Sequence, residues 1–174
     1  PQATLYIHCI KALELVLSRF SKRGLPLIGE GDWNDGLSNV GPDWKGESIW
    51  LGHFLYCVLI EFARLCELIE KDAIVKEYDE RALSLKKALN KYGFDGSYFI
   101  GATKDDGSPL GSRKNKEGKI YLNSQTWAII SGSATKENAK KAMESARKHL
   151  YREYGPLLLT PAYTSPDSSI GYIT

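Results

Sequence analysis

The chain has 174 residues, with 23 Lys and Arg against 21 Asp and Glu, so its formal net charge is +2. Hydrophobic residues make up 43% and charged residues 25%, which is typical of a folded globular domain and argues against wholesale disorder. Binding to a nucleic-acid backbone or an acidic membrane needs clustered positive charge, so we expect neither partner. Three cysteines (Cys9, Cys57 and Cys66) cannot all pair with one another, and no signal peptide opens the chain. We therefore expect buried thiols in a cytoplasmic protein.

The first part of the chain predicts two helices separated by a long loop. Apolar side chains recur at helical spacing over residues 3–20, which predicts an amphipathic helix. Residues 21–47 break this pattern with glycines and prolines and predict a loop of about 25 residues, a length that is usually functional in a compact domain. Residues 48–68 predict a helix whose first half is apolar on every side. That apolar run spans only about 12 residues, short of the roughly 20 that a bilayer requires, so we expect an interior helix.

The second part predicts shorter elements of alternating character. In chain order they are a charged, solvent-facing helix over 72–91; a β-hairpin or two small strands within 92–123, with a turn at 105–107; a short inner helix over 124–132, ended by Gly132; an amphipathic helix over 136–150, capped by Thr135; and a loop over 151–174.

Buried and exposed helices therefore alternate along the chain, as they do where an inner ring of helices is wrapped by an outer ring. A complete toroid of twelve helices needs more chain than 174 residues. We expect an all-α fold, a partial (α/α)6 barrel with a small β-hairpin insertion, in which residues 1–174 form one fragment of a catalytic barrel domain.

The densest polar cluster lies at Gly29–Gly36 (GEGDWNDG), inside the predicted loop. It holds three carboxylates, one amide and a tryptophan. An indole can stack on the apolar face of a sugar, carboxylates and amides can bind hydroxyls, and one carboxylic acid can protonate a glycosidic oxygen. The alternative is an Asx-rich turn, in which Asp and Asn bond their own backbone. Both interpretations are open on the sequence alone.

The run Gly31–Gly36 (GDWNDG), followed by Lys45–Leu51 (KGESIWL), closely resembles the catalytic signature of glycoside hydrolase family 94, the inverting β-glycan phosphorylases. Further matching pieces, in family order, are GLPL at 24–27, SQTWAIISG at 124–132 and PAYT at 161–164. The family includes cellobiose and 1,2-β-oligoglucan phosphorylases and the corresponding region of cyclic β-1,2-glucan synthases. The resemblance implies an α/α barrel and places the N-terminal β-sandwich and the C-terminal phosphate-binding part of such proteins outside residues 1–174.

The resemblance also implies roles for particular residues. It makes Asp35 the general acid and places Trp33 at the subsite of the sugar whose bond is broken. We add Asp32, Asn34 and Glu47 as candidate substrate-binding residues, since they lie in or just after the same loop. Gln125, on the predicted inner helix, could face the sugar as well. The implied partners are an oligosaccharide substrate and inorganic phosphate as co-substrate. We expect no metal and no other cofactor. We also expect the chain to be part of either a homo-oligomer or a larger polypeptide.

Two rival hypotheses belong to other classes. The first is an inverting hydrolase on the same barrel, with Asp35 as acid and Glu47 as base, which would act without phosphate. The second is an inactive sugar-binding or structural fragment, whose exposed apolar helix faces would need to be covered. His53 lies in the apolar helix 48–60, and we expect a hydrogen-bonded core residue there.

Overall fold

The computed structural model describes residues 2–174, and for Asp35 it describes the backbone alone. The helices and strands of the described residues are α1 (Leu5–Leu17), the 3-10 helix η1 (Asp35–Leu37), β1 (Glu47–Ser48), α2 (Ile49–Leu68), α3 (Asp72–Tyr92), β2 (Ala102–Thr103), β3 (Pro109–Leu110), β4 (Ile120–Tyr121), α4 (Leu122–Ile130), α5 (Lys136–His149), β5 (Tyr151–Arg152), β6 (Gly155–Pro156) and β7 (Leu159–Thr160).

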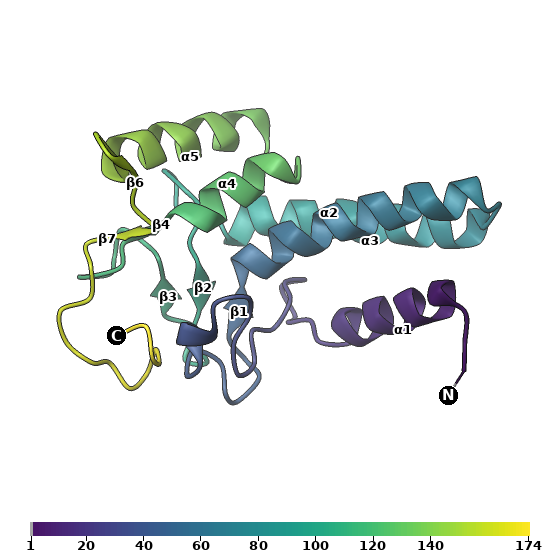
Figure 1. Cartoon of the computed structure of the whole chain (residues 1–174), viewed down its shortest axis with the longest axis horizontal. Coiled ribbons are helices and arrows are strands. Elements are labelled where there is room, and N and C mark those ends of the chain that lie inside the picture. The colour runs from purple at the N-terminus through teal and green to yellow at the C-terminus, as the bar shows by residue number, and fades with distance from the viewer. Residues whose placement is uncertain (1) are drawn as a thin grey trace.

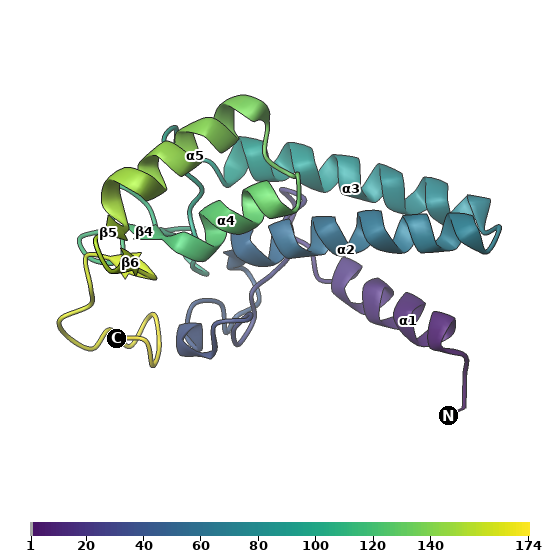
Figure 2. The same ribbon diagram turned by 45° about the horizontal axis from the view of Figure 1, so that its top comes forward.

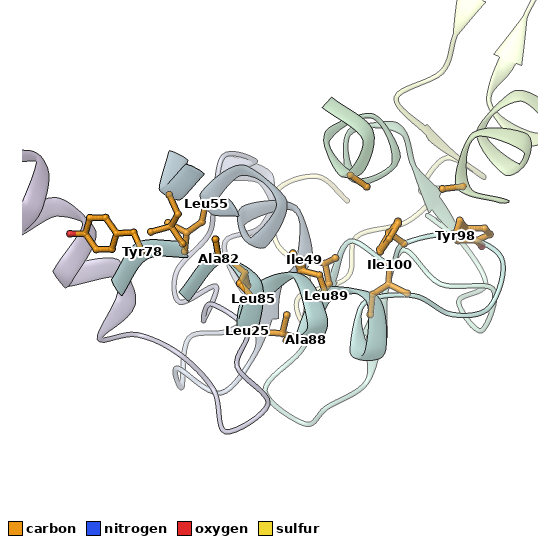
Figure 3. Close-up of a cluster of buried hydrophobic side chains, with 14 of the residues drawn as sticks. Leu25, Ile49, Leu55, Tyr78, Ala82, Leu85, Ala88, Leu89, Tyr98 and Ile100 are labelled. Carbon is orange, nitrogen blue, oxygen red and sulfur yellow. The ribbon is translucent and has the colours of Figure 1, made fainter. Parts of the chain in front are cut away.

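The two longest helices, α2 and α3, form an antiparallel pair whose facing side chains make up a large part of the main hydrophobic cluster. They lie side by side in both views (Figures 1 and 2). Leu55 and Leu59 of α2 are buried together with Leu85 and Leu89 of α3. Figure 3 labels Leu55, Leu85 and Leu89 among the side chains of this cluster. Each fully buried leucine contributes about 1.5–3 kcal/mol of transfer free energy, so this seam holds the pair together.

The other helices pack around one end or one side of this pair. Tyr6 of α1 stacks on Phe62 of α2, with ring centroids 6.0 Å apart. The helix α4 crosses the beginning of α2, and α5 lies over α4 (Figures 1 and 2). Thr135 caps α5 as the sequence predicts, because its hydroxyl oxygen accepts the N–H of Asn138 at 3.2 Å.

The strands are only two residues long and form three small sheets. The predicted hairpin with its turn at 105–107 is confirmed, and β2 and β3 are its strands on either side of that turn. β1 adds to its edge in the order β1-β2-β3. The tail 151–174 is more than a loop, because β5 pairs with β6 and β7 pairs with β4. Strands this short carry no periodicity that a sequence could reveal.

The described residues are thus rich in helix, which agrees with the expected fold class at that level, and the small sheets add strands that an all-α fold does not include. Among them α2 is the helix long and apolar enough to cross a membrane by length and composition, and half of that window is buried inside the structure. The expectation of buried thiols is correct for Cys66 but wrong for Cys9 and Cys57, which are partly exposed on the flanks of α1 and α2.

Candidate functional site

The loop that holds the polar cluster is tied to the start of α2 by Asp32. Its Oδ1 accepts the backbone N–H of Asn34 at 2.8 Å, and its Oδ2 accepts the hydroxyl of Ser48 at 2.5 Å. The same Ser48 oxygen accepts the N–H of Leu51 at 2.9 Å and so caps α2. One serine therefore joins the loop to the helix, and Asp32, a candidate substrate-binding residue, uses both its carboxylate oxygens to anchor the loop.

Burial governs the ionisation of Asp32. It raises the pKa of the Asp32 carboxyl above its usual value, although the hydrogen bonds from Ser48 and from the Asn34 N–H favour the charged form and oppose the rise. The loop thus surrounds a carboxyl group with an environment that disfavours negative charge.

Asp35 begins the 3-10 helix η1 immediately after this anchor. Asn34 caps the helix, because its side-chain oxygen accepts the N–H of Gly36 at 3.0 Å. Asp32 and Asn34 thus form successive Asx-type turns, so the alternative of an Asx-rich turn is correct as a description of the local backbone. The side chain of Asp35, and with it the predicted general acid, lies outside the described part of the chain.

Trp33 projects from the loop and remains 62% exposed. The centroid of its ring lies 5.7 Å from the ring centroid of Trp50, and the two ring planes make an angle of 36°. Trp50 stacks in turn on Phe54, and Trp127 of α4 meets both rings edge-on, at 6.1 and 5.3 Å. Trp33 is therefore supported from behind by an aromatic cluster (Trp50, Phe54 and Trp127), while its own surface stays open to a ligand.

Glu47, also named as a candidate ligand, is only 2% exposed. Arg23 donates from Nε to Glu47 Oε1 at 3.0 Å and from Nη2 to Oε2. The Thr103 hydroxyl, on β2, donates to Oε2 as well at 3.3 Å. Both carboxylate oxygens of Glu47 are therefore occupied by protein donors, in an ion pair that holds β1 to its surroundings.

Gln125, the candidate from α4, is fully buried. Its Nε2 donates to the carbonyl oxygens of Phe99 at 2.7 Å and Tyr121 at 3.0 Å, and its Oε1 accepts the Phe99 N–H at 2.9 Å. Phe99 forms an isolated antiparallel bridge with Phe94, and the Gln125 amide bonds the N–H and carbonyl oxygen of Phe99 itself, as a neighbouring backbone would. The structure thus separates the candidates into a loop group, in which Trp33 is exposed and Asp32 and Asn34 are half-buried beside the Asp35 backbone, and a buried pair (Glu47 and Gln125).

Asp105 is a structural residue that the sequence did not single out beyond its turn. Its carboxylate accepts the backbone N–H groups of Asp43, Lys45 and Gly46 at 2.8–2.9 Å. Burial opposes its ionisation, but these three donors prevail and lower the pKa of Asp105 below its usual value. The hairpin turn thus fixes the far end of the long loop. An aspartate in a turn carries no sequence signal for such a distant bond.

His53 is a hydrogen-bonded core residue, as expected. It is fully buried, its Nδ1 lies 2.6 Å from the Ser133 Oγ, and burial lowers its pKa to about 3. Its other ring nitrogen has no hydrogen-bond partner among the described residues. Within those residues no group of three or more metal-ligating side chains comes together.

A cavity of about 880 Å³ lies away from the loop, between α5 and the approach to β4. None of residues 29–36 lines it, and its charged lining is mostly basic: Arg113, Lys119, Lys141, Glu144, Lys148 and Arg152. The candidate site is therefore identified by its side chains and their support rather than by a cavity in this chain.

An exposed indole beside short polar side chains on a braced loop is typical of a site that binds a sugar. The model of the Glycosyl hydrolase 94 superfamily, catalytic domain, matches residues 1–174. The chain belongs to this family, which confirms the resemblance found in its motifs.

Three curated relatives align over nearly the whole chain. Solabiose phosphorylase of Paenibacillus borealis is 40% identical over 172 residues, which is 98% of this chain and 22% of that protein. The cyclic beta-(1,2)-glucan synthase NdvB of Rhizobium meliloti (strain 1021) is 36% identical over 170 residues, 97% of this chain and 6% of that protein. The 3-O-beta-D-glucopyranosyl-beta-D-glucuronide phosphorylase of Paenibacillus borealis is 33% identical over 172 residues, 99% of this chain and 22% of that protein. The chain thus spans about a fifth or less of the length of these relatives.

Proposed function

We propose that the full-length protein carrying this chain is an inverting phosphorylase that cleaves a β-glucosidic bond with inorganic phosphate and releases α-glucose 1-phosphate. Membership of the family supports this reaction, as do two of the relatives named above, which are phosphorylases of different disaccharide-type substrates. The observation that carries the proposal is the loop in which Trp33, packed on Trp50, lies two residues before Asp35 at the start of η1.

In the proposed reaction Asp35 is the general acid. A phosphate oxygen bonds to the anomeric carbon from one face while the bond from that carbon to the glycosidic oxygen breaks on the other. The Asp35 proton passes to the departing oxygen. Phosphate is already an anionic nucleophile, so no second carboxylate is needed as a base.

Trp33 is proposed to stack on the sugar whose bond is broken, with its ring held in place by Trp50. Asp32 and Asn34 shape the loop under this ring through their backbone hydrogen bonds. These two residues act on the substrate chiefly by fixing where Trp33 and Asp35 stand.

The buried state of Glu47 favours phosphorolysis over the rival hydrolysis. A general base must reach a water molecule on the open face of the sugar. Both Glu47 oxygens are bonded to Arg23 and Thr103, and the side chain is buried. Glu47 is therefore placed to hold β1 rather than to activate water.

We also propose that these helices form part of an (α/α)6 barrel in the full-length protein. The buried side chains of α2 and α4 support an inner position in the barrel for these two helices. The charged faces of α3 and α5 support an outer position for the other two. Leu68 and Ile130, at the ends of the two proposed inner helices, are 82% and 67% exposed in this chain. Such side chains would pack against neighbouring barrel helices.

The reaction is tested by incubating the full-length protein with a panel of β-linked glucosides, with and without inorganic phosphate. We expect α-glucose 1-phosphate to form only when phosphate is present, with the α configuration read from the anomeric proton coupling in NMR. Release of free glucose in phosphate-free buffer at a comparable rate would favour the hydrolase. Sugar binding without turnover of any glucoside in the panel would favour the inactive fragment.

A further inference from the structure

Residues 167–174 lie directly against the turn that carries Asp35, although the two are far apart in sequence. The N–H of Ile173 donates to the carbonyl oxygen of Gly36 at 3.0 Å. In Figures 1 and 2 the end of the chain lies beside the short helix η1. The residue that follows Asp35 is therefore hydrogen-bonded to this segment through its backbone.

A second set of bonds holds the other end of the turn. The backbone N–H of Asn39 donates to the Ile170 oxygen at 3.0 Å, and its side-chain Nδ2 donates to the Ser168 oxygen at 2.9 Å. Ile170 is itself buried in a small apolar cluster with Leu37 and Val40. Residues 36–40 are thus bonded at both ends to the 167–174 segment, which is anchored in the core beneath them.

Gly171 makes this close approach possible. Its φ is +125°, and a Cβ added to it would lie 2.5 Å from the Ser38 Oγ and 2.7 Å from the Gly36 carbonyl oxygen. These distances are well inside van der Waals contact, and one of the opposing atoms is backbone. Any side chain at position 171 must therefore move the segment or the turn that it touches.

The segment also holds its own shape. Asp167 accepts the N–H and the hydroxyl of Ser169 through Oδ1 at 2.9 and 2.6 Å, and the Thr174 hydroxyl oxygen accepts the Asp167 N–H at 2.7 Å. Lys104, next to β2, donates to the Ser169 Oγ at 2.6 Å. Because these hydrogen bonds close the segment and tie it to Lys104, the segment can hold the turn that it contacts in one position.

We infer that residues 167–174 position the proton donor, and that Gly171 is a positioning residue which sets the place of Asp35 through the Gly36–Ser38 backbone. The inference rests on the proposed function, in which Asp35 is the general acid. A misplacement of about 1 Å in a reacting group can cost about 100-fold in rate. Proton donation should be the step affected, because the turn bonded to the segment follows Asp35 directly in the chain.

The test compares two glycine-to-alanine variants of the full-length enzyme. Gly155, on β6, has nearly the same backbone angle, φ +121°, but no atom lies within 4 Å of the position that a Cβ would take there. Gly155→Ala therefore carries the same backbone strain as Gly171→Ala without the contact. We expect Gly171→Ala to lower kcat on an alkyl-type glucoside by about 10–100-fold while KM changes by less than about threefold. Gly155→Ala should leave kcat unchanged.

The signature of positioning is dependence on the leaving group. The loss in Gly171→Ala should shrink on an aryl β-glucoside, whose leaving oxygen needs little protonation, and should disappear in an Asp35→Asn background. Equal losses in the two glycine variants, or equal losses on both glucosides, would overturn the inference.

If Gly171→Ala does not fold, Asn39→Ala takes its place. This variant removes only the side-chain bond to the Ser168 oxygen, and we expect a loss of about 3–10-fold with the same dependence on the leaving group. Loss without that dependence contradicts the inference. Asp35→Asn is measured on the same two glucosides. If its loss is equal on both, the proposed general acid and the inference are both wrong. If its loss depends on the leaving group while the loss in Gly171→Ala or Asn39→Ala does not, only the inference is wrong.

Discussion

The loop around Trp33 and the buried side chains of Glu47 and Gln125 both hold carboxylate and amide groups, but only the loop also presents a side chain with a free surface. Both carboxylate oxygens of Glu47 and both ends of the Gln125 amide are engaged by protein partners. The Trp33 ring is held on one side and open on the other. Buried polar groups need partners and find them inside the protein. A ligand site is therefore recognised by binding capacity that remains free, and the predictions below test this distinction.

The largest expected effect comes from Asp35. In the full-length enzyme Asp35→Asn should lower the phosphorolysis rate by about 10²–10⁴-fold, since an amide cannot donate the proton that the leaving oxygen needs. Initial rates at saturating phosphate measure the loss. Asp43→Asn, an exposed aspartate of the same long loop, is the control and should keep the wild-type rate. A wild-type rate in Asp35→Asn would remove the general acid from this loop.

Gln125 should affect stability and leave substrate binding intact. Gln125→Leu leaves the N–H and the carbonyl oxygen of Phe99 buried without the bonds that the amide supplies, so we expect the free energy of unfolding to fall by about 2–4 kcal/mol. Denaturant titration measures the fall, and KM of the folded variant should not change. Thr126→Val, which removes a hydroxyl bonded only within α4, should cost less than about 1 kcal/mol. A raised KM in Gln125→Leu at unchanged stability would move Gln125 into the substrate site.

Trp33, in contrast, should affect substrate binding and leave stability nearly unchanged. Trp33→Ala should weaken glucan binding by about 1–3 kcal/mol and leave the melting temperature nearly unchanged, because the ring is largely exposed. Calorimetry on the full-length protein gives the affinity. Trp44 is a matched control, an exposed tryptophan of the same loop whose ring lies under Arg19 instead of on the aromatic cluster. Equal losses of affinity in Trp44→Ala would show that the site is not specific to Trp33.

The last prediction concerns pH, and its effect is small near neutral pH. Burial lowers the pKa of His53 to about 3, so the folded state stays neutral where the unfolded chain, near 6.5, takes up a proton. Stability from this residue is complete above about pH 6.5 and falls by at most about 1.4 kcal/mol per pH unit as the pH drops toward 3. Nitrogen-15 shifts of the imidazole should report a neutral ring at pH 5. A ring that titrates near pH 6.5 would contradict the burial of His53.

Helices were predictable from the sequence because their signals are local. The apolar surround of residues 49–60 placed α2, and Thr135 marked the start of α5 to the residue. The pairing of β4 with β7, and the bonds from Asp105 to the far end of the loop, join residues about 40 to 60 positions apart. No local pattern encodes such pairings.

The candidate site was predictable in part for the same reason. The cluster at 29–36 stood out by its composition, and its Asx-type turns follow from the identity of Asp32 and Asn34. Whether Glu47 and Gln125 face a sugar or the protein depends on Arg23, Thr103 and Phe99, which the chain brings to them from elsewhere. The contact between Gly171 and the Gly36–Ser38 turn likewise exists only in three dimensions.

The central claim is that Asp35 donates the proton while Asp32, three residues earlier, anchors the loop through Ser48 and the Asn34 N–H. The most direct measurement compares Asp35→Asn and Asp32→Asn in the full-length enzyme on two β-glucosides, one with an alkyl and one with an aryl leaving group. We expect the loss in Asp35→Asn to shrink strongly on the aryl glucoside and the loss in Asp32→Asn to be the same on both. Dependence on the leaving group in Asp32→Asn and its absence in Asp35→Asn would reverse the two roles and contradict the claim.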